Sequence, residues 1–291
     1  MPRSLLIVNP KASAVTPERV ETVKAELERA TDLELVWTER RGHATELAQE
    51  TDAEAIIVFS GDGGFNEVLN GARSDVPVGF VPGGGSSVLP RALGLPRDPV
   101  VACARLVESI RSDRSRRISI GRVNGRGFGF AAALGFPAEV VRRIDELGRE
   151  SGRRPPDRAF ALTIGRELLR RRGRIEPSLD VDGEPVSFIL VANGDPYTYF
   201  SRFPLRFAPD ADFEAGLDLV APRDLRPGGV TRLLAAAALG RRAGGVLYRH
   251  DVDQLVVSSP EPVALQVDGE DLGDVDRAVF ESVPGALTVL G

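Results

Sequence analysis

Three short turns have the residue types and spacing of a phosphate-binding site. They are Asn9 to Ser13, Ser60 to Glu67 and Pro82 to Ser87, and each directly follows a short apolar run, at 5–8, 56–59 and 78–81. Glycine lets the backbone approach an anion closely, and the first turn of a helix presents N–H groups that have no acceptor within the helix. The two glycine-rich turns therefore predict a polyphosphate site built from main-chain amides. The alternative is that they only connect strands to helices.

Asp62 stands between two of these glycines. A carboxylate among phosphate-binding amides repels the ligand unless it binds a divalent cation or accepts a proton, and Mg²⁺ would remove that conflict. The other interpretation is an ordinary turn aspartate. The only lysines, Lys11 and Lys24, do not follow a glycine, so the lysine-dependent P-loop signature is absent. Any nucleotide site must rely on backbone and carboxylate chemistry.

The elements that position these turns follow from the apolar pattern of residues 1–115. Short apolar runs alternate with helical patterns, which is typical of strand and crossover-helix units in a parallel sheet. Helices are expected after Thr16, over 44–50, 65–71 and 86–93, and from Asp98, with Cys103 on a buried face. Because ligands of open parallel sheets bind at the carboxyl ends of the strands, we expect all three turns at one edge. The prediction is a Rossmann-like α/β domain.

From about residue 116 the sequence changes to β-branched and aromatic runs separated by Gly, Pro and Asp. This pattern predicts a mostly antiparallel β domain over 116–279. An insert over 142–174 interrupts it with 11 Arg against 5 acidic residues. Two interpretations stay open for the insert: an amphipathic helix that covers the sheet, or a basic surface helix that touches anionic headgroups.

Composition limits the function classes. The chain has 291 residues, 42% hydrophobic and 27% charged, with a formal net charge of −5, one cysteine and two histidines. These values favour a folded protein of two domains and argue against a zinc cluster and a nucleic-acid partner. No run of 18 apolar residues occurs, and the run 5–8 is too short for a signal peptide. We expect a cytoplasmic protein that meets the inner membrane face only peripherally; a homodimer stays open.

Five segments in order and spacing resemble the diacylglycerol kinase catalytic-domain family, which includes bacterial lipid kinases and sphingosine kinases. They are NPKAS, SGDGGFNEVLNG, VPGGGSSVLPRALGLP, NGDPYTYF and QVDGEDLG. The resemblance implies an ATP-dependent kinase that acts on the hydroxyl of a diacylglycerol-like lipid. It also implies a nucleotide-binding α/β domain, a β-sandwich lipid-binding domain, an active site in the cleft between them, and a last strand near 280–291 that returns to the first domain.

Carried over by position, the resemblance assigns the nucleotide contacts, with Mg²⁺ on Asp62, to Asn9, Pro10, Lys11, Ala12, Ser13, Thr38, Gly61, Asp62, Gly63, Gly64, Phe65, Asn66, Glu67, Gly84, Gly85, Ser86 and Ser87. In Asp268-Gly269-Glu270, Glu270 or Asp268 would accept the proton of the attacking hydroxyl. The residues alone favour a hairpin turn here, because Asp-Gly is a strong hairpin signal. Val-Asp-Gly-Glu also occurs twice, at 181–184 and 267–270, so only the resemblance selects the second copy.

Three departures from the family pattern concern the phosphate and metal sites. Gly64 stands where most members have threonine, and Gly85 and Ser87 stand where they have a Thr-x-Asn. Each change removes a polar contact of about 1 to 2 kcal/mol, or roughly tenfold in affinity or rate. In the β domain, Asp212 matches an aspartate of a structural magnesium site, but Ala215 replaces the next carboxylate. Alternatives are an NAD kinase-like enzyme and a catalytically weak lipid-binding protein.

Aromatic residues of the second half are the candidates for an apolar lipid pocket. They are Phe130, Phe136, Phe188, Phe200 and Phe203. Aromatics in strand-like runs also serve simply as core, and both interpretations are kept. Arg91 is a further candidate phosphate contact, with a surface salt bridge as its alternative, whereas His43 is expected to be a polar cap or a surface residue and not a catalyst.

Overall fold

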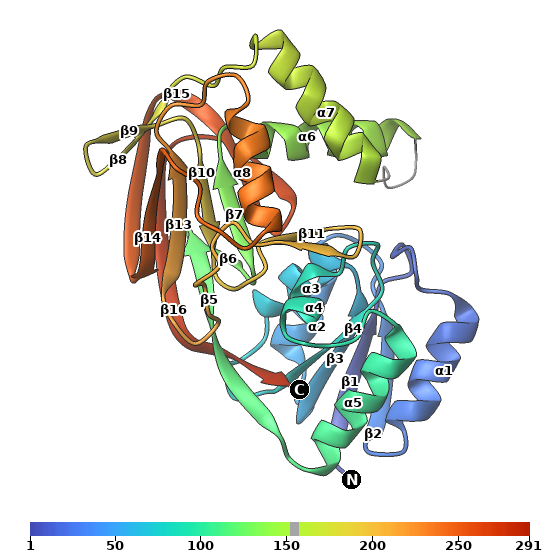
Figure 1. Cartoon of the computed structure of the whole chain (residues 1–291). Helices are drawn as coiled ribbons and strands as arrows, with labels where there is room; N and C mark the ends of the chain where they lie inside the picture. The colour runs from blue at the N-terminus through green and yellow to red at the C-terminus, as the bar shows by residue number, and fades with distance from the viewer. Residues whose placement is uncertain (152–156) are drawn as a thin grey trace. The chain divides into compact units, whose positions relative to one another are not determined.

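A computed structural model of the chain describes residues 1–151 and 157–291 (Figure 1). The chain forms two compact units. Unit 1 comprises Met1–Ile120 and Val283–Gly291, and unit 2 comprises Gly121–Ser282. Unit 2 is therefore inserted between the two segments of unit 1.

Unit 1 contains a parallel sheet in the order β16-β4-β3-β1-β2. Its strands are β1 (Arg3–Val8), β2 (Asp32–Trp37), β3 (Ala55–Ser60), β4 (Val78–Pro82) and the end of β16 (Glu270–Leu290). All residues of β3 and β4 are buried, as expected for strands covered on both faces. The predicted parallel α/β fold is confirmed.

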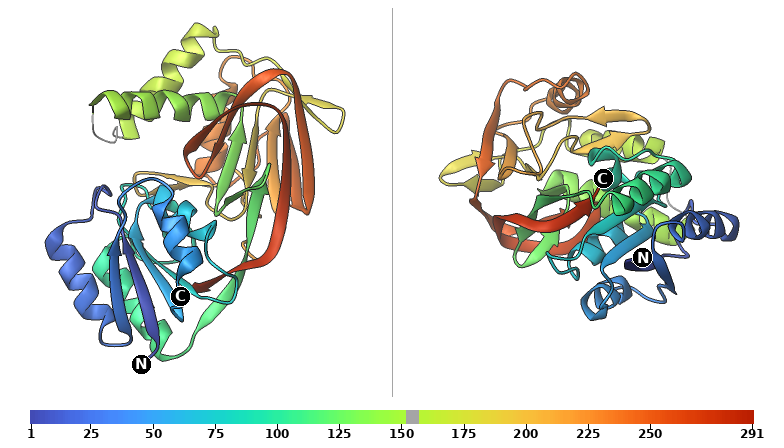
Figure 2. Two further views of the ribbon diagram at one scale, coloured as in Figure 1. Left: turned by 180° about the vertical axis from the view of Figure 1, so that it is seen from behind. Right: turned by 90° about the horizontal axis from the view of Figure 1, so that it is seen from below.

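The helices of unit 1 are α1 (Pro17–Leu27), α2 (His43–Glu50), α3 (Asp62–Leu69), α4 (Val88–Ala92) and α5 (Pro99–Arg111). Two of them, α1 and α5, begin at residues whose side chains cap them. Thr16 caps α1, and Asp98 caps α5 by accepting from the N–H groups of Val100 and Val101. Cys103 lies on the buried face of α5. Figure 2 shows helices on both faces of this sheet.

Unit 2 is an antiparallel β structure, also as predicted. Strands β7 (Ala131–Leu134), β10 (Ile189–Ala192), β13 (Leu217–Pro222), β14 (Val246–Val252), β15 (Gln254–Val267) and β16 follow the order β14-β13-β10-β7-β15-β16. Shorter hairpins join β5 (Ser115–Val123) to β6 (Arg126–Phe128), β8 (Leu179–Val181) to β9 (Glu184–Val186), and β11 (Thr198–Phe200) to β12 (Phe203–Leu205). One buried core collects side chains from most of these strands.

Strand β15 joins the two parts of this core. It is one continuous strand with a register shift between Ser258 and Val263. Before the shift Val257 pairs with β8, and after it Leu265 pairs with β7. An irregularity of this kind bends a strand, so a single strand serves both parts of the β structure.

Three helices complete unit 2. Two helices occupy most of the arginine-rich segment, α6 (Phe136–Ser151) and α7 (Asp157–Arg170); residues 152–156 of the predicted insert lie outside the described residues. Helix α6 buries Ala138, Val140 and Ile144. The third helix is α8 (Gly229–Ala238). Across the described residues, no helix combines the length and apolar character needed to span a membrane.

Candidate active site

The two glycine turns that follow β3 and β4 are in direct backbone contact. The Gly83 N–H donates to the Ser60 carbonyl at 2.6 Å. A Cβ on Gly84 would lie 2.8 Å from the Gly61 Cα, and a Cβ on Gly83 would lie 2.8 Å from the Ser60 oxygen. Side chains at these positions would separate the turns, so glycine is required for the close approach.

The first turn joins the same edge of the sheet. The Asn9 N–H donates to the Phe59 carbonyl at 3.1 Å, and the Ala14 N–H donates to the Gly83 carbonyl at 2.8 Å. The Asn9 side chain accepts from the Lys11 N–H at 2.9 Å, which fixes this turn. Thr38, one residue beyond β2, donates its N–H to the Val8 carbonyl. The backbones of the three predicted turns and of Thr38 therefore gather at the carboxyl ends of the strands.

Asp62 connects the second turn to the third. It is the first residue of α3, and its Oδ1 accepts from the N–H of Val88 at 2.6 Å and of Leu89 at 3.4 Å. Asp62 thus caps α4, which starts at Val88 instead of at the expected residue 86. Ser87 has a left-handed backbone with φ 43° and makes no cap hydrogen bond. Since Asp62 uses the first amides of α4, this helix does not present them to an anion.

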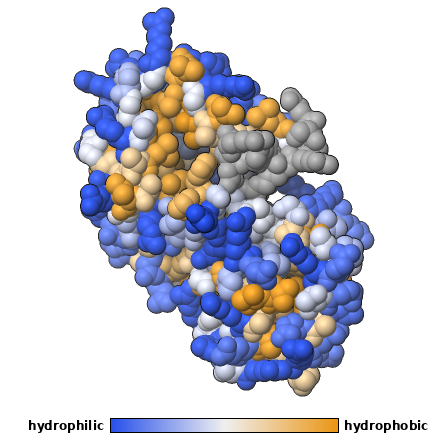
Figure 3. All heavy atoms as spheres, turned by 45° about the vertical axis from the view of Figure 1, so that its right-hand side comes forward, coloured by the Kyte–Doolittle hydropathy of each residue, from blue (hydrophilic) through white to orange (hydrophobic). Residues whose placement is uncertain are grey.

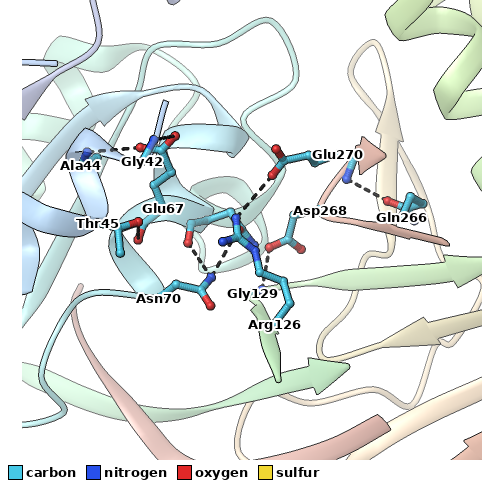
Figure 4. A network of polar contacts seen from close by, with 12 residues as sticks. Gly42, Ala44, Thr45, Glu67, Asn70, Arg126, Gly129, Gln266, Asp268 and Glu270 are labelled. Carbon is cyan, nitrogen blue, oxygen red and sulfur yellow. Dashed lines mark hydrogen bonds and ion pairs between the residues drawn. The ribbon is translucent and has the colours of Figure 1, made fainter. Parts of the chain in front are cut away.

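The side chains of three predicted nucleotide contacts are used in packing or hydrogen bonding within the protein. They are Phe65, Asn66 and Glu67. Phe65 packs edge-to-face against Phe80 in the core, with ring centroids 5.2 Å apart, and Asn66 is fully buried. The Glu67 carboxylate accepts from the N–H groups of Gly42 at 2.9 Å and Ala44 at 3.2 Å, at the start of α2 (Figure 4). These residues hold α3 in place, and the backbone of the preceding glycines is left for ligand binding.

Two arginines contact the third turn. Arg91, a predicted candidate, donates from Nη1 to the Ser86 carbonyl at 3.2 Å. Arg97, which sequence reasoning missed, donates from Nη2 to the Gly85 carbonyl at 3.3 Å. Arg97 follows the end of this turn by ten residues, beyond α4, so its position gave no local signal. His43 is the first residue of α2 and accepts from the Glu39 N–H through Nδ1 at 3.1 Å; the cap position of α2 is Gly42, so His43 is not the cap of this helix.

The late carboxylates lie in the hairpin between β15 and β16. Asp268 is buried and accepts three backbone hydrogen bonds, from Gly129 at 2.7 Å, Phe130 at 3.0 Å and Ala131 at 3.1 Å; Figure 4 shows the bond from Gly129. These bonds engage both oxygens of its carboxylate. Glu270 pairs with Arg126, with Oε2 and Nη2 3.4 Å apart, and its side chain is 20% exposed.

Asp-Gly is a hairpin turn in both copies of the repeated motif. In the first copy φ is 52° at Asp182 and 84° at Gly183. In the second copy φ is 47° at Asp268 and 82° at Gly269. The hairpin interpretation therefore holds for both. Only their surroundings differ, because Asp182 is exposed and pairs with Arg249, whereas Asp268 is buried.

Asp212 belongs to a local turn, where its Oδ1 accepts from the Glu214 N–H at 2.9 Å. Within residues 1–151 and 157–291, no three His, Cys, Asp or Glu side chains are grouped so that they could hold a metal ion. Among the predicted pocket aromatics, Phe130, Phe136 and Phe188 are buried core residues. The other two, Phe200 and Phe203, are 43% and 59% exposed.

Comparison with known proteins identifies the first part of the chain. The sequence profile of the family described as "Diacylglycerol kinase catalytic domain" matches residues 3–123. Residues 3–123 are therefore similar to diacylglycerol kinase catalytic domains. The resemblance stated from the turn motifs is thereby confirmed, and the match covers the four β strands and all three turns gathered at their carboxyl ends.

Relatives extend the match along the chain. A diacylglycerol kinase of Staphylococcus carnosus is 28% identical over 92% of this chain and 88% of its own length. A Streptococcus pneumoniae relative is 28% identical over 50% of this chain and 51% of its own. The crystal structure of a Bacillus anthracis diacylglycerol kinase covers 99% of this chain and 96% of its own, with a TM-score of 0.71 and 20% identity.

A more distant fold relative is an NAD kinase from Archaeoglobus fulgidus, whose structure was solved with ATP. It has a TM-score of 0.55 and 12% identity, and the match covers 99% of this chain and 93% of that one. At this identity the likeness concerns the fold alone.

Proposed function

We propose that this chain is an ATP-dependent lipid kinase that phosphorylates the hydroxyl of a diacylglycerol-like lipid. The observation that carries the proposal is the backbone contact between the glycine turns at 61–64 and 83–87, inside the segment matched by the kinase family. Amides at such turns can hold a polyphosphate without a lysine. The ATP held by the NAD kinase of related fold supports the same choice of nucleotide.

The residues at the turns fit a magnesium ion that arrives with the nucleotide. Mg²⁺ in kinases is held by substrate phosphates and only one or two carboxylates, so a single carboxylate is sufficient. Asp62 would hold it, because its carboxylate lies where the two turns meet and is anchored by the N–H groups of Val88 and Leu89. The ion would neutralise charge on the phosphates during transfer.

For the proton acceptor we propose Glu270 in preference to Asp268. Both oxygens of the Asp268 carboxylate already accept backbone hydrogen bonds, three in all, so they are not directed at a substrate hydroxyl. Glu270 pairs with Arg126, and its side chain is 20% exposed. A partly exposed carboxylate can accept a proton from a hydroxyl and release it to water.

A lipid substrate requires access to a membrane, and we propose that α7 contacts anionic headgroups. Leu162 and Leu169 are seven residues apart, hence on one face of the helix, and are 60% and 80% exposed. Among the described residues no ion pair engages Arg166 or Arg172, whereas Arg171 pairs with Glu139. An exposed apolar face beside unpaired arginines is typical of a helix at a lipid interface. Figure 3 shows further hydrophobic side chains gathered over unit 2.

The membrane proposal is tested by sedimentation with vesicles of phosphatidylglycerol or phosphatidylcholine. Replacing both Leu162 and Leu169 by serine should reduce binding to the anionic vesicles at least fivefold. Leu239→Ser is the matched control, because Leu239 is 69% exposed but follows α8. Equal binding by the double variant and the wild type would remove α7 from the proposal.

The activity itself is tested with the purified chain, Mg²⁺ and γ-labelled ATP, offering diacylglycerol, a sphingoid base, a polyprenol and NAD in parallel. Label in diacylglycerol is the expected result. Label in NAD would replace the proposal by the NAD kinase alternative. Lipid that copurifies without turnover would indicate a lipid-binding protein.

A further inference from the structure

We infer that the Ser60 hydroxyl is a nucleotide-phosphate contact that stands in for the side chain missing at Gly64. The inference rests on the proposed function, since it assigns a further residue to the same nucleotide site. Ser60 is the last residue of β3 and the first residue of the second predicted turn, but the sequence did not assign its side chain to the nucleotide contacts.

The Ser60 side chain occupies the space that a side chain at position 64 would fill. A Cβ built on Gly64 would lie 2.1 Å from the Ser60 Oγ and 2.7 Å from the Ser60 Cβ. Real Cβ atoms do not approach other atoms so closely, so only glycine fits at position 64 while residue 60 is serine. The next atom is the Asn9 Nδ2, at 4.0 Å from that Cβ. The serine hydroxyl therefore lies between two turns of the proposed nucleotide site.

The Ser60 hydroxyl has no hydrogen-bond partner among the described residues, although the residue is only 1% exposed. A buried hydroxyl without a partner opposes folding, and alanine at the same place would avoid that cost. Such a group is explained when a ligand supplies the partner. The acceptor oxygens of a phosphate are suitable partners for this donor.

The neighbouring backbone offers donors to the same ligand. Gly63 and Gly64 fall in the first turn of α3, where the helix provides no acceptor for their N–H groups. Gly63 is exposed, and a Cβ there would meet nothing within 4 Å. A phosphate at this turn would receive backbone N–H groups and, after a small local adjustment, the serine hydroxyl. Ser60 then supplies the hydroxyl that most family members carry on a threonine at position 64.

The test compares Ser60→Ala, Gly64→Thr and the double variant Ser60→Gly/Gly64→Thr. Binding of Mg²⁺·ATP is measured by calorimetry, and the melting temperature is measured without nucleotide. We expect Ser60→Ala to raise the Kd for ATP about tenfold, the scale of one lost hydrogen bond to a charged group, with a melting temperature equal to or above that of the wild type. Gly64→Thr should melt lower because of the overlap with Ser60. The double variant should recover both the melting temperature and ATP affinity.

The control is Ser109→Ala, which removes a buried hydroxyl of α5 that already donates to the Arg105 carbonyl. This variant should melt lower and bind ATP normally. Unchanged ATP affinity in Ser60→Ala would overturn the inference whether or not the double variant folds. The proposed function fails differently, through a wild type that binds no ATP or that binds ATP without labelling any lipid.

Discussion

Asp62 is predicted to have two separable roles, a cap on α4 and a ligand for the nucleotide-bound cation. Asp62→Asn keeps an acceptor oxygen for the Val88 and Leu89 N–H groups, at 2.6 and 3.4 Å, and removes the charge. Because asparagine caps helices as well as aspartate does, the free energy of unfolding should change little. Loss of the charge should reduce turnover by roughly a hundredfold or more, about 3 kcal/mol of barrier. Asp62→Ala should lose the same turnover and also about 1 kcal/mol of stability.

The assay combines initial rates, measured with γ-labelled ATP and diacylglycerol, with urea unfolding of the same preparations. The informative quantity is the difference between the asparagine and alanine variants. An asparagine variant that turns over within threefold of the wild type would refute the cation role. An asparagine variant as unstable as the alanine variant would refute the cap.

Four other predictions concern single side chains. Glu270→Gln should lower kcat by about 10² or more at little cost in stability; a kcat within threefold of the wild type would exclude Glu270 as the base. Asp268→Asn should instead lower the free energy of unfolding by about 1–3 kcal/mol, since an amide cannot satisfy three N–H donors; urea unfolding would show this. Burial raises the pKa of the Cys103 thiol to about 12, so a thiol reagent should react with it only after denaturation, and rapid labelling of the folded chain would contradict this. Burial also raises the pKa of Asp195 to about 6 in spite of Arg206. The folded chain then keeps a proton that the unfolded chain has lost, and stability should fall by about 2 kcal/mol as pH rises from about 4 to 6. Asp195→Asn should flatten that slope in unfolding curves recorded across the window.

The sheet of unit 1 could be predicted because each strand is an apolar run that ends in a turn motif. The boundary of α3 was harder to predict. The sequence placed its start at Phe65, since Gly63 and Gly64 are poor helix formers, but the structure starts it at Asp62. Helix α4, by contrast, starts later than expected, at Val88 instead of residue 86. Its cap comes from Asp62, 26 residues earlier in the chain. A cap supplied across the fold leaves no local signal.

The residues of the candidate site also fall into those that the sequence could assign and those that it could not. The glycines of the two turns could be assigned from sequence, because two turns can approach each other this closely only where they carry no side chains. The direction of the Phe65 and Glu67 side chains could not be predicted, since both belong to a recognisable motif but face the core and the start of α2. Ser60 begins one of the predicted turns, but the sequence does not show where its hydroxyl lies; its overlap with a side chain at Gly64 does.

Strand β16 has a consequence for any attempt to produce unit 1 by itself. Its final residues lie beside β4, with Val289 opposite Val78, and bury Leu287 and Val289. A fragment that stops at residue 120 would lack this neighbour and would expose the backbone edge of β4, an apolar strand. An unpaired edge of this kind promotes self-association. A circular permutant that fuses 283–291 ahead of residue 1 through a flexible linker would be the better way to isolate the nucleotide-binding half.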